Sequence, residues 1–160
     1  MTVISVDKSI ENLTMTFVAE FDASAERVWQ VWQDPRTLER WWGPPSYPAT
    51  FVSHDFVEGG QSSYYMTSPE GEKYWGWWKL TAIDAPSHLE FDDGFADADG
   101  KPDFTIEPAH AAVDLVETNG STRMTVVSTF VSAENFEKQL EMGMEEGMRQ
   151  AMGQLDAILA

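Results

Sequence analysis

The hydrophobic pattern of this chain changes its period once, near Ser132, and this change limits the folds available to it. Between residues 12 and 130, outside one short helical stretch, apolar and polar residues alternate as they do in strands with one buried face. After Ser132, apolar residues recur every three or four positions, which is typical of an amphipathic helix. Strands and helices do not alternate regularly along the chain, so we predict the α+β class, with an antiparallel sheet and a helix lying across it.

The segments expected to form this fold follow a simple order. The first strand covers residues 12–22, and Ser24 caps a short helix that Asp34 and Pro35 interrupt. A second short helix ends at Gly-Pro-Pro, residues 43–45. Turn-like separators divide the next region into strands at residues 49–56, 60–67, 73–83, 87–95, 111–117 and 122–130, so the sheet has about six or seven strands. One helix of about seven turns closes the chain.

The whole chain, residues 1–160, is expected to be a single domain. Its length and its hydrophobic content of 42% suffice for one sizeable core but not for two ordinary domains. We expect residues 1–10 to be a loosely ordered N-terminal extension. A straight helix cannot pack against a curved sheet along its whole length, so a cavity between them is also expected.

The net charge, the N-terminal sequence and the cysteine content limit which partners the protein can bind and where in the cell we expect it. A formal net charge of −17 repels phosphate backbones and anionic lipid surfaces, which argues against nucleic acid and membrane partners. The N-terminus lacks the pattern of a secretory leader, and no apolar run approaches ~18 residues. The chain contains no cysteine, in agreement with a reducing compartment. We therefore expect a cytoplasmic protein.

Large and flexible side chains are concentrated in two regions. Four of the seven tryptophans, at positions 29, 32, 41 and 42, form either a core wall or a ligand surface, and the sequence leaves this choice open. Methionines 142, 144, 148 and 152 suit a wall that accepts ligands of varying shape, although ordinary packing explains them equally well. Glycines 143, 147 and 153 in the predicted helix indicate either a close approach to the sheet or space for a ligand.

Motifs for metal binding and covalent catalysis are missing from the sequence. The acidic stretch 92–103 does not fit the spacing of a calcium-binding loop and instead predicts a solvated loop. His54, His88 and His110 fall on different expected strands or strand edges, without the close spacing of a transition-metal site. Neither a nucleophile elbow nor a phosphate-binding loop is present. We expect no metal and no cofactor.

Several short motifs occur in a fixed order between residues 10 and 160. They are Phe21-Asp22-Ala23-Ser24-Ala25-Glu26-Arg27-Val28-Trp29, Asp34-Pro35, Arg40-Trp41-Trp42-Gly43-Pro44, Gly59-Gly60, Pro69-Glu70-Gly71, Gly76, and Gly143-Met144 followed by Glu146-Gly147. In this combination the chain resembles the START-like proteins related to the activator of the heat-shock protein 90 ATPase. Two departures from that family are Val57-Glu58 in place of a common Arg-Pro, and Gly147-Met148 in place of a common Gly-Trp.

The resemblance implies a helix-grip fold with a hydrophobic cavity under the C-terminal helix. Its expected function is the binding of a small apolar molecule, aromatic or lipid-like, whose identity is unknown. The residues expected to line the cavity come from the short helices, the strands and the last helix: Trp32, Trp41, Trp42, Tyr64, Met66, Trp78, Phe91, Leu115, Met144, Met148 and Met152.

Two other functions remain open on this resemblance. The first is a chaperone-linked protein-interaction module, although the chain has no room for the separate N-terminal domain with which the eukaryotic activator grips the chaperone. The second is a cavity-based enzyme of the cyclase, dehydratase or hydrolase type, for which His54, Asp55 and Arg123 are candidates if they point inward. We expect a monomer or a homodimer.

Overall fold

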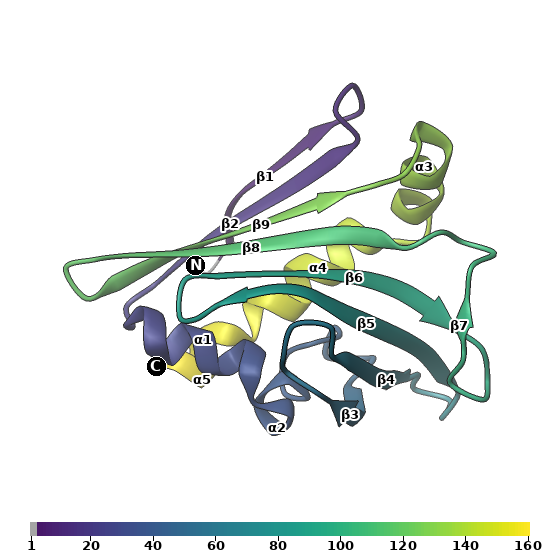
Figure 1. Cartoon of the computed structure of the whole chain (residues 1–160), viewed down its shortest axis with the longest axis horizontal. Helices are drawn as coiled ribbons and strands as arrows, with labels where there is room; N and C mark the ends of the chain where they lie inside the picture. Colours follow the sequence, from purple (N-terminus) through teal and green to yellow (C-terminus); the bar gives the residue numbers. More distant parts are fainter. Residues whose placement is uncertain (1–2) are drawn as a thin grey trace.

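One antiparallel sheet dominates the computed structural model, which describes residues 3–160 (Figure 1). Its strands are ordered β1-β2-β9-β8-β6-β5-β4-β3, and the short β7 pairs with β6 beside this path. The strands are β1 (Val3–Ser9), β2 (Thr14–Phe21), β3 (Ala49–His54), β4 (Gln61–Thr67), β5 (Lys73–Asp84), β6 (His88–Ala96), β7 (Pro102–Asp103), β8 (Ala109–Thr118) and β9 (Ser121–Thr129). The helices are α1 (Ala25–Gln33), α2 (Pro35–Leu38), α3 (Ala133–Glu141), α4 (Met144–Gly153) and α5 (Leu155–Leu159). The predicted α+β class is confirmed.

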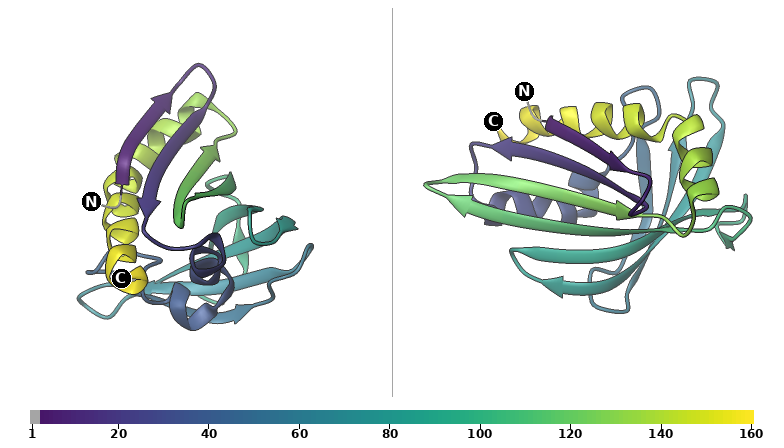
Figure 2. Two further views of the ribbon diagram at one scale, coloured as in Figure 1. Left: turned by 90° about the vertical axis from the view of Figure 1, so that its left-hand side faces the viewer. Right: turned by 90° about the horizontal axis from the view of Figure 1, so that it is seen from above.

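The sheet curves around the C-terminal helices and keeps its core on the concave side (Figure 2). Every second residue of each long strand faces this side, as Phe17, Val126 and Val113 do in neighbouring strands, and all three are buried. The helices α4 and α5 run across the concave side, and α1 and α2 close one end of it. This arrangement is the helix-grip architecture that we predicted.

The N-terminal segment differs from its prediction. Residues 3–9 are not a loosely ordered extension, because β1 pairs with β2 from Val3↔Ala19 to Ser9↔Thr14. Position at the sheet edge explains the error, since an edge strand meets solvent and can be polar along much of its length. Most side chains between residues 5 and 9 are exposed, and only Val6 packs against the core.

The C-terminal segment also differs, because the single long helix that we predicted is three helices. The first break lies at Gly143, which has a left-handed backbone with φ of 85° and precedes the first residue of α4. The second lies at Gln154, between α4 and α5. A Cβ at Gly143, Gly147 or Gly153 would meet no atom within 4 Å, so a close approach of the helix to the sheet does not explain these glycines.

The described helices include none that is long and apolar enough to cross a membrane.

Candidate functional site

An aromatic cluster fills the middle of the concave side and contains five of the predicted cavity residues. Trp78 stacks on Phe91 with a distance of 4.3 Å between ring centroids, and Trp42 meets Trp78 edge-on at 4.8 Å. Trp32 meets Trp41 edge-on, also at 4.8 Å. All five side chains are at most 5% exposed. The tryptophan run of the sequence is therefore mainly a core wall, built from offset and edge-to-face ring pairs.

Gly43 allows the chain to turn sharply directly after Trp41 and Trp42. Its φ is 107°, and a Cβ there would collide with the backbone oxygen of Tyr47. The side-chain amide of Gln154 donates a hydrogen bond to the Gly43 carbonyl at 2.8 Å and a longer one to the Trp41 carbonyl at 3.3 Å. The junction of α4 and α5 is thus hydrogen-bonded directly to the Trp41-Trp42-Gly43 segment.

A tyrosine and an aspartate form a polar pair beside this cluster, on the same concave face. The Tyr64 hydroxyl donates a hydrogen bond of 2.9 Å to Oδ1 of Asp93. Asp93 is opposite Trp78 on β5 and opposite Ala109 on β8, both of which are buried. Gly76 provides room for the tyrosine, because a Cβ there would lie 2.5 Å from the Tyr64 ring. The pair is therefore built into the inner face of the sheet.

Burial controls the protonation of both members of the Tyr64–Asp93 pair. Burial raises the pKa of Asp93 to about 7, while the Tyr64 hydroxyl and the Trp78 indole act in the opposite direction. Burial and the neighbouring Asp93 also raise the pKa of Tyr64 well above its usual value, and Trp42 and Trp78 oppose this shift. Near neutral pH, Asp93 is therefore divided between its protonated and ionised forms.

Two buried indole N–H groups next to this pair lack an acceptor. Nε1 of Trp42 and Nε1 of Trp78 have no hydrogen-bond partner within residues 3–160. The other two deeply buried indoles of the cluster are paired, since Trp32 donates to Met124 Sδ at 3.4 Å and Trp41 donates to the Val31 carbonyl at 2.9 Å. Both indoles nevertheless lower the pKa of Tyr64, and Trp78 also lowers the pKa of Asp93, so the two N–H groups lie near this pair without the geometry of a full hydrogen bond.

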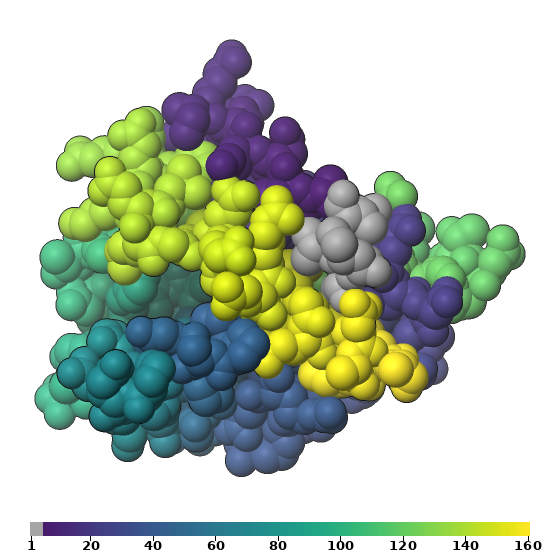
Figure 3. Space-filling model, turned by 180° about the vertical axis from the view of Figure 1, so that it is seen from behind, coloured from purple at the N-terminus to yellow at the C-terminus, as the bar shows by residue number. Residues whose placement is uncertain are grey.

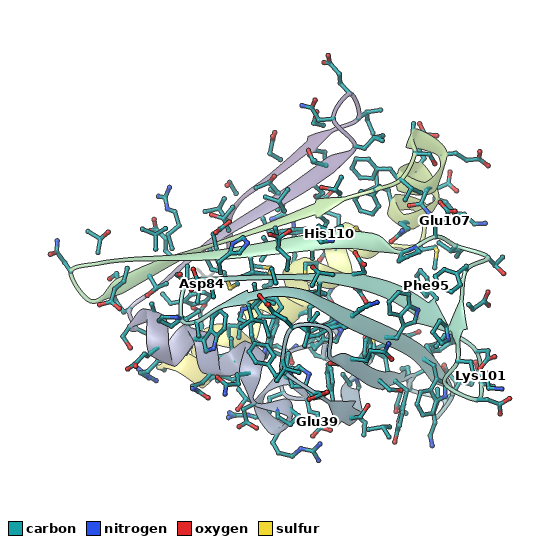
Figure 4. All side chains as sticks on the ribbon, viewed as in Figure 1. Glu39, Asp84, Phe95, Lys101, Glu107 and His110 are labelled. Carbon is teal, nitrogen blue, oxygen red and sulfur yellow. The ribbon has the colours of Figure 1, made fainter. Side chains whose placement is uncertain are left out.

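The concave side is less covered toward the end where α3 turns away from the axis of α4 (Figure 2). Met66, Met144 and Met148 are only half-buried there, although they pack against the core. Farther toward the edge, Phe95 is 37% exposed, and Figure 4 shows it where β6 approaches β7. Figure 3 shows the corresponding recess between α3 and α4 on one side and the segment after α2 on the other. Asp93 is half-buried and lies two residues before Phe95 on the same face.

Two further predicted cavity residues lie away from this opening. Met152, near the C-terminal end of α4, is fully buried. Leu115 is opposite Met124, toward the end of the sheet that α1 covers. It is six residues along β8 from Ala109, the partner of Asp93, which corresponds to about 20 Å. The structure therefore does not bring Leu115 together with the open end of the recess.

The three candidate catalytic residues do not form a site. His54 contacts the Ser62 hydroxyl at 2.7 Å and the Trp32 carbonyl at 3.0 Å, and burial lowers its pKa, so it is a neutral structural histidine. Asp55 is exposed. Arg123 lies on the outer face of β9 and pairs with Glu20 at 2.7 Å. A reaction that uses these three groups together has no support in this geometry.

The other two histidines meet on the outer face of the sheet. Glu90 lies between them and contacts His88 at 2.8 Å and His110 at 2.7 Å. Hydrogen bonds with Glu90 and Asp114 raise the pKa of His88. At His110, partial burial lowers the pKa, but hydrogen bonds with Glu90 and Asp92 outweigh this effect and raise it. No group of three or more potential ligands among residues 3–160 has an arrangement that could hold a metal ion.

Two shallow hollows on the outer surface lie beside α1, away from the recess. One, of about 540 Å³, is lined partly by Glu20, Asp22 and Arg27, and the other, of about 580 Å³, follows α1 itself. Neither includes a predicted cavity residue or an unpartnered buried polar group.

Asp93 is the residue of this site that the sequence analysis missed. We predicted a strand at residues 87–95 but interpreted the overlapping acidic stretch 92–103 as a solvated loop, and we did not count Asp93 among the cavity residues; β6 continues to Ala96. The available signal was strand parity, because Leu89 and Phe91 face inward and Asp93 is the next position in that series.

Comparison with known proteins agrees with the architecture described above. A family model, "Activator of Hsp90 ATPase homolog 1-like protein", matches residues 22–160. Functionally curated proteins give no match.

Solved structures give close matches over nearly the whole chain. A solution NMR structure of a protein from Arthrobacter aurescens is 57% identical, with 99% of this chain and 92% of that chain covered and a TM-score of 0.96. The crystal structure of protein Ms6760 from Mycobacterium smegmatis is 46% identical, with coverage of 99% and 97% and a TM-score of 0.91. A protein from Staphylococcus epidermidis, 24% identical with a TM-score of 0.84 and coverage of 98% and 93%, shares the fold.

Proposed function

The chain belongs to the family of Activator of Hsp90 ATPase homolog 1-like proteins, and we propose that it binds a small apolar ligand, aromatic or lipid-like, in the recess between the sheet and α4. The observation that carries this proposal is the partial exposure of Met66, Met144 and Met148 on the inner side of the fold. Apolar side chains on a concave, partly open surface favour binding of an apolar molecule.

The side chains around the recess support a ligand of adaptable shape. Methionine is unbranched and polarisable, so three methionines can repack around different apolar surfaces. The break at Gly143 turns α3 away from the axis of α4 and so leaves this end of the concave side less covered (Figure 2). The fully buried aromatic cluster provides a rigid wall behind the methionines.

Methyl NMR of methionine-labelled protein tests the proposal with 2-ethylnaphthalene as the probe. We expect saturable shifts of the methyl signals of Met66, Met144 and Met148, whereas the fully buried Met15 on β2 should move little. Replacing Met148→Trp should fill the recess and weaken binding at least tenfold. Val116→Trp is the control, because Val116 is 61% exposed on β8 toward the α1 end of the sheet.

The proposal also makes a prediction for the protein as it is isolated. Native mass spectrometry of the freshly purified chain should detect a co-purified small molecule that M148W lacks. If 2-ethylnaphthalene shifts no inner-face methionine, or binds M148W and the wild type equally, an apolar ligand site in the recess is contradicted.

A chaperone-linked interaction is the second candidate, and an aromatic patch on the outer face favours it. The patch consists of Tyr65, Trp75, Trp77 and Phe104; the rings of Tyr65 and Trp75 are 4.9 Å apart, and those of Trp77 and Phe104 are 5.9 Å apart. Phe104 is 61% exposed. Exposed aromatic groups of this kind mark many protein-binding surfaces.

A pull-down with a purified chaperone of the heat-shock protein 90 class at low salt tests this second candidate. We expect capture by the wild type and loss of capture by the double variant W75S/F104S, with Val116→Ser as the control. Equal capture by the double variant and the wild type, or no capture by either, would count against the patch.

A further inference from the structure

Two histidines and three carboxylates are connected by hydrogen bonds across β6 and β8 on the outer face of the sheet. Nδ1 of His88 contacts Asp114 at 2.6 Å, and Nδ1 of His110 contacts Asp92 at 2.8 Å. Nε2 of each ring contacts Glu90, at 2.8 Å from His88 and 2.7 Å from His110. Every ring nitrogen of this outer-face cluster therefore has a carboxylate oxygen within hydrogen-bond distance.

This arrangement favours the doubly protonated form of both rings. A neutral imidazole has one N–H donor and one bare nitrogen, and a bare nitrogen cannot donate to an ionised carboxylate. The charged imidazolium donates from both nitrogens and satisfies both carboxylates. These hydrogen bonds raise the pKa of His88 above its usual 6.5 and lower the pKa of Glu90 below its usual 4.5. At His110, partial burial lowers the pKa, but the hydrogen bonds outweigh it and the pKa is raised.

The outer-face cluster lies where two halves of the sheet meet. One half is β1-β2-β9-β8 and the other is β6-β5-β4-β3, and the pairing of β6 with β8 joins them (Figure 1). No tight hairpin connects these two strands, because residues 97–108 lie between them in the chain. His88 is directly opposite Asp114, and Asp92 is directly opposite His110, which Figure 4 shows on β8. Opposite charges at such positions stabilise strand pairing.

We propose that the outer-face cluster is a pH-sensitive switch that holds β6 against β8 while both histidines are protonated and allows this pair to open locally when they lose their protons. Deprotonation removes both positive charges and leaves three carboxylates close together, which repel one another. Asp93 and Ala109 pair on the inner face of the same two strands, so opening there also loosens the wall of the recess.

The charges on the neighbouring strands do not replace the lost protons. On β5, Asp84 is opposite His88 and Lys79 is opposite Asp92, so one further negative and one positive charge face the cluster from this side. In residues 3–160, Lys79 forms no ion pair with the cluster. On β9, the positions opposite residues 110, 112 and 114 of β8 are Thr129, Val127 and Thr125, which carry no charge.

The direction of the pH dependence follows from the shifted pKa values. A histidine whose pKa is raised by folding contributes its full stabilisation below the unfolded value of 6.5 and loses it as the pH rises through the folded value. Glu90, whose pKa is lowered, contributes above 4.5 and loses its contribution as the pH falls through its folded value. The cluster therefore holds the strands together most strongly between pH 4.5 and 6.5 and progressively less above this range.

NMR titration of the histidine rings in the full-length wild type tests the first part of the proposal. We expect His88 and His110 to titrate above pH 6.5 and the half-buried His54 to titrate below it. Glu90→Gln should lower the titration midpoints of both outer histidines, and Asp114→Asn should lower the midpoint of His88 more than that of His110. Glu107→Gln is the control, because this exposed glutamate lies in the loop before β8 and should change neither midpoint.

Amide hydrogen exchange tests whether the cluster controls the pairing of β6 with β8. The full-length D93N variant is used, because it removes the titration of Asp93 on the inner face of the same strands. After correction for the intrinsic exchange rate, protection of the amides that pair β6 with β8 should fall at least threefold from pH 6 to pH 8. Amides that pair β2 with β9 should change less than twofold. In the triple variant D93N/H88N/H110N, the protection between β6 and β8 should no longer depend on pH.

Several outcomes would overturn the proposal. Midpoints of His88 and His110 at or below pH 6.5, or midpoints that E90Q leaves unchanged, would show that the carboxylates do not hold the rings in their charged form. Protection that is constant from pH 6 to pH 8, or that falls equally between β2 and β9, would show that the cluster does not control this strand pair. Both measurements are made without a ligand, so their results do not depend on the function proposed above.

Discussion

Replacing Asp93→Asn should stabilise the protein relative to the wild type, and increasingly so as the pH rises. Burial raises the pKa of Asp93 from 3.8 to about 7. In the unfolded chain the carboxyl ionises near its ordinary pKa, whereas in the folded chain it keeps its proton until about pH 7. Between these values the folded state binds more protons, so the wild-type free energy of unfolding falls as the pH rises and levels off above the folded pKa.

The magnitude follows from the difference between the two pKa values. Each pKa unit corresponds to about 1.4 kcal/mol, so the full penalty above pH 7 is about 4 kcal/mol at most. Partial hydration of the half-buried carboxyl reduces it. Because part of the penalty is already present at pH 5, the stability difference between D93N and the wild type should widen by at most about 2–3 kcal/mol from pH 5 to pH 8.

Urea unfolding followed by tryptophan fluorescence at pH 5, 6, 7 and 8 measures this difference. Comparing the variant with the wild type at each pH cancels the titration of the other acidic groups. Asp99→Asn is the control, because the Asp99 side chain is exposed in the turn after β6. The free energies of unfolding of D99N and the wild type should differ by no more than about 0.5 kcal/mol at each pH. A D93N difference that is constant from pH 5 to pH 8, or that shrinks, would refute the assignment of Asp93 as a buried carboxyl that favours its neutral form.

Three further substitutions test the packing of the fold by urea unfolding. Gly76→Ala should cost about 1–3 kcal/mol, because the new Cβ would meet the Tyr64 ring at 2.5 Å; wild-type stability would show that the ring moves freely. Trp41→Ala should cost about 3–5 kcal/mol, because the side chain is fully buried, and a loss below 1 kcal/mol would contradict its place in the core. Lys8→Ala should cost less than about 1 kcal/mol, because its 2.7 Å ion pair with Glu145 is exposed to solvent.

The sequence pattern predicted the architecture because most strands have one buried face. Alternation placed the strands near their observed bounds, and turn residues separated them. The pattern failed at β1, where an edge strand is largely polar, and at Gly143, where a helical period continues across a break in the backbone. Periodicity reports which side chains are buried and does not report whether successive helical segments share one axis.

The site was harder to predict because its parts meet only in the folded sheet. Tyr64 was expected in the cavity, but its partner Asp93 lies in an acidic stretch whose composition resembles that of a loop. The lack of an acceptor for Trp42 and Trp78 depends on the packing of rings from the segment after α2 and from β5 and β6, which no local pattern contains. Residues such as His54 were also misleading, because a half-buried histidine that is held by two neighbours looks the same in sequence as a catalytic one.

The hydrogen bonds from Gln154 hold the C-terminal helices in place at the junction of α4 and α5, whereas the position of the opposite end, at Gly143, can differ between related chains. The Trp41-Trp42-Gly43 segment, which carries much of the family resemblance, serves as the anchor through the carbonyls of Gly43 and Trp41. Differences in ligand size between related chains should therefore arise at the opposite end, where α3 and α4 meet at Gly143. The most recognisable motif of the family marks where the helix is attached, and the junction at Gly143 sets how much space remains beneath it.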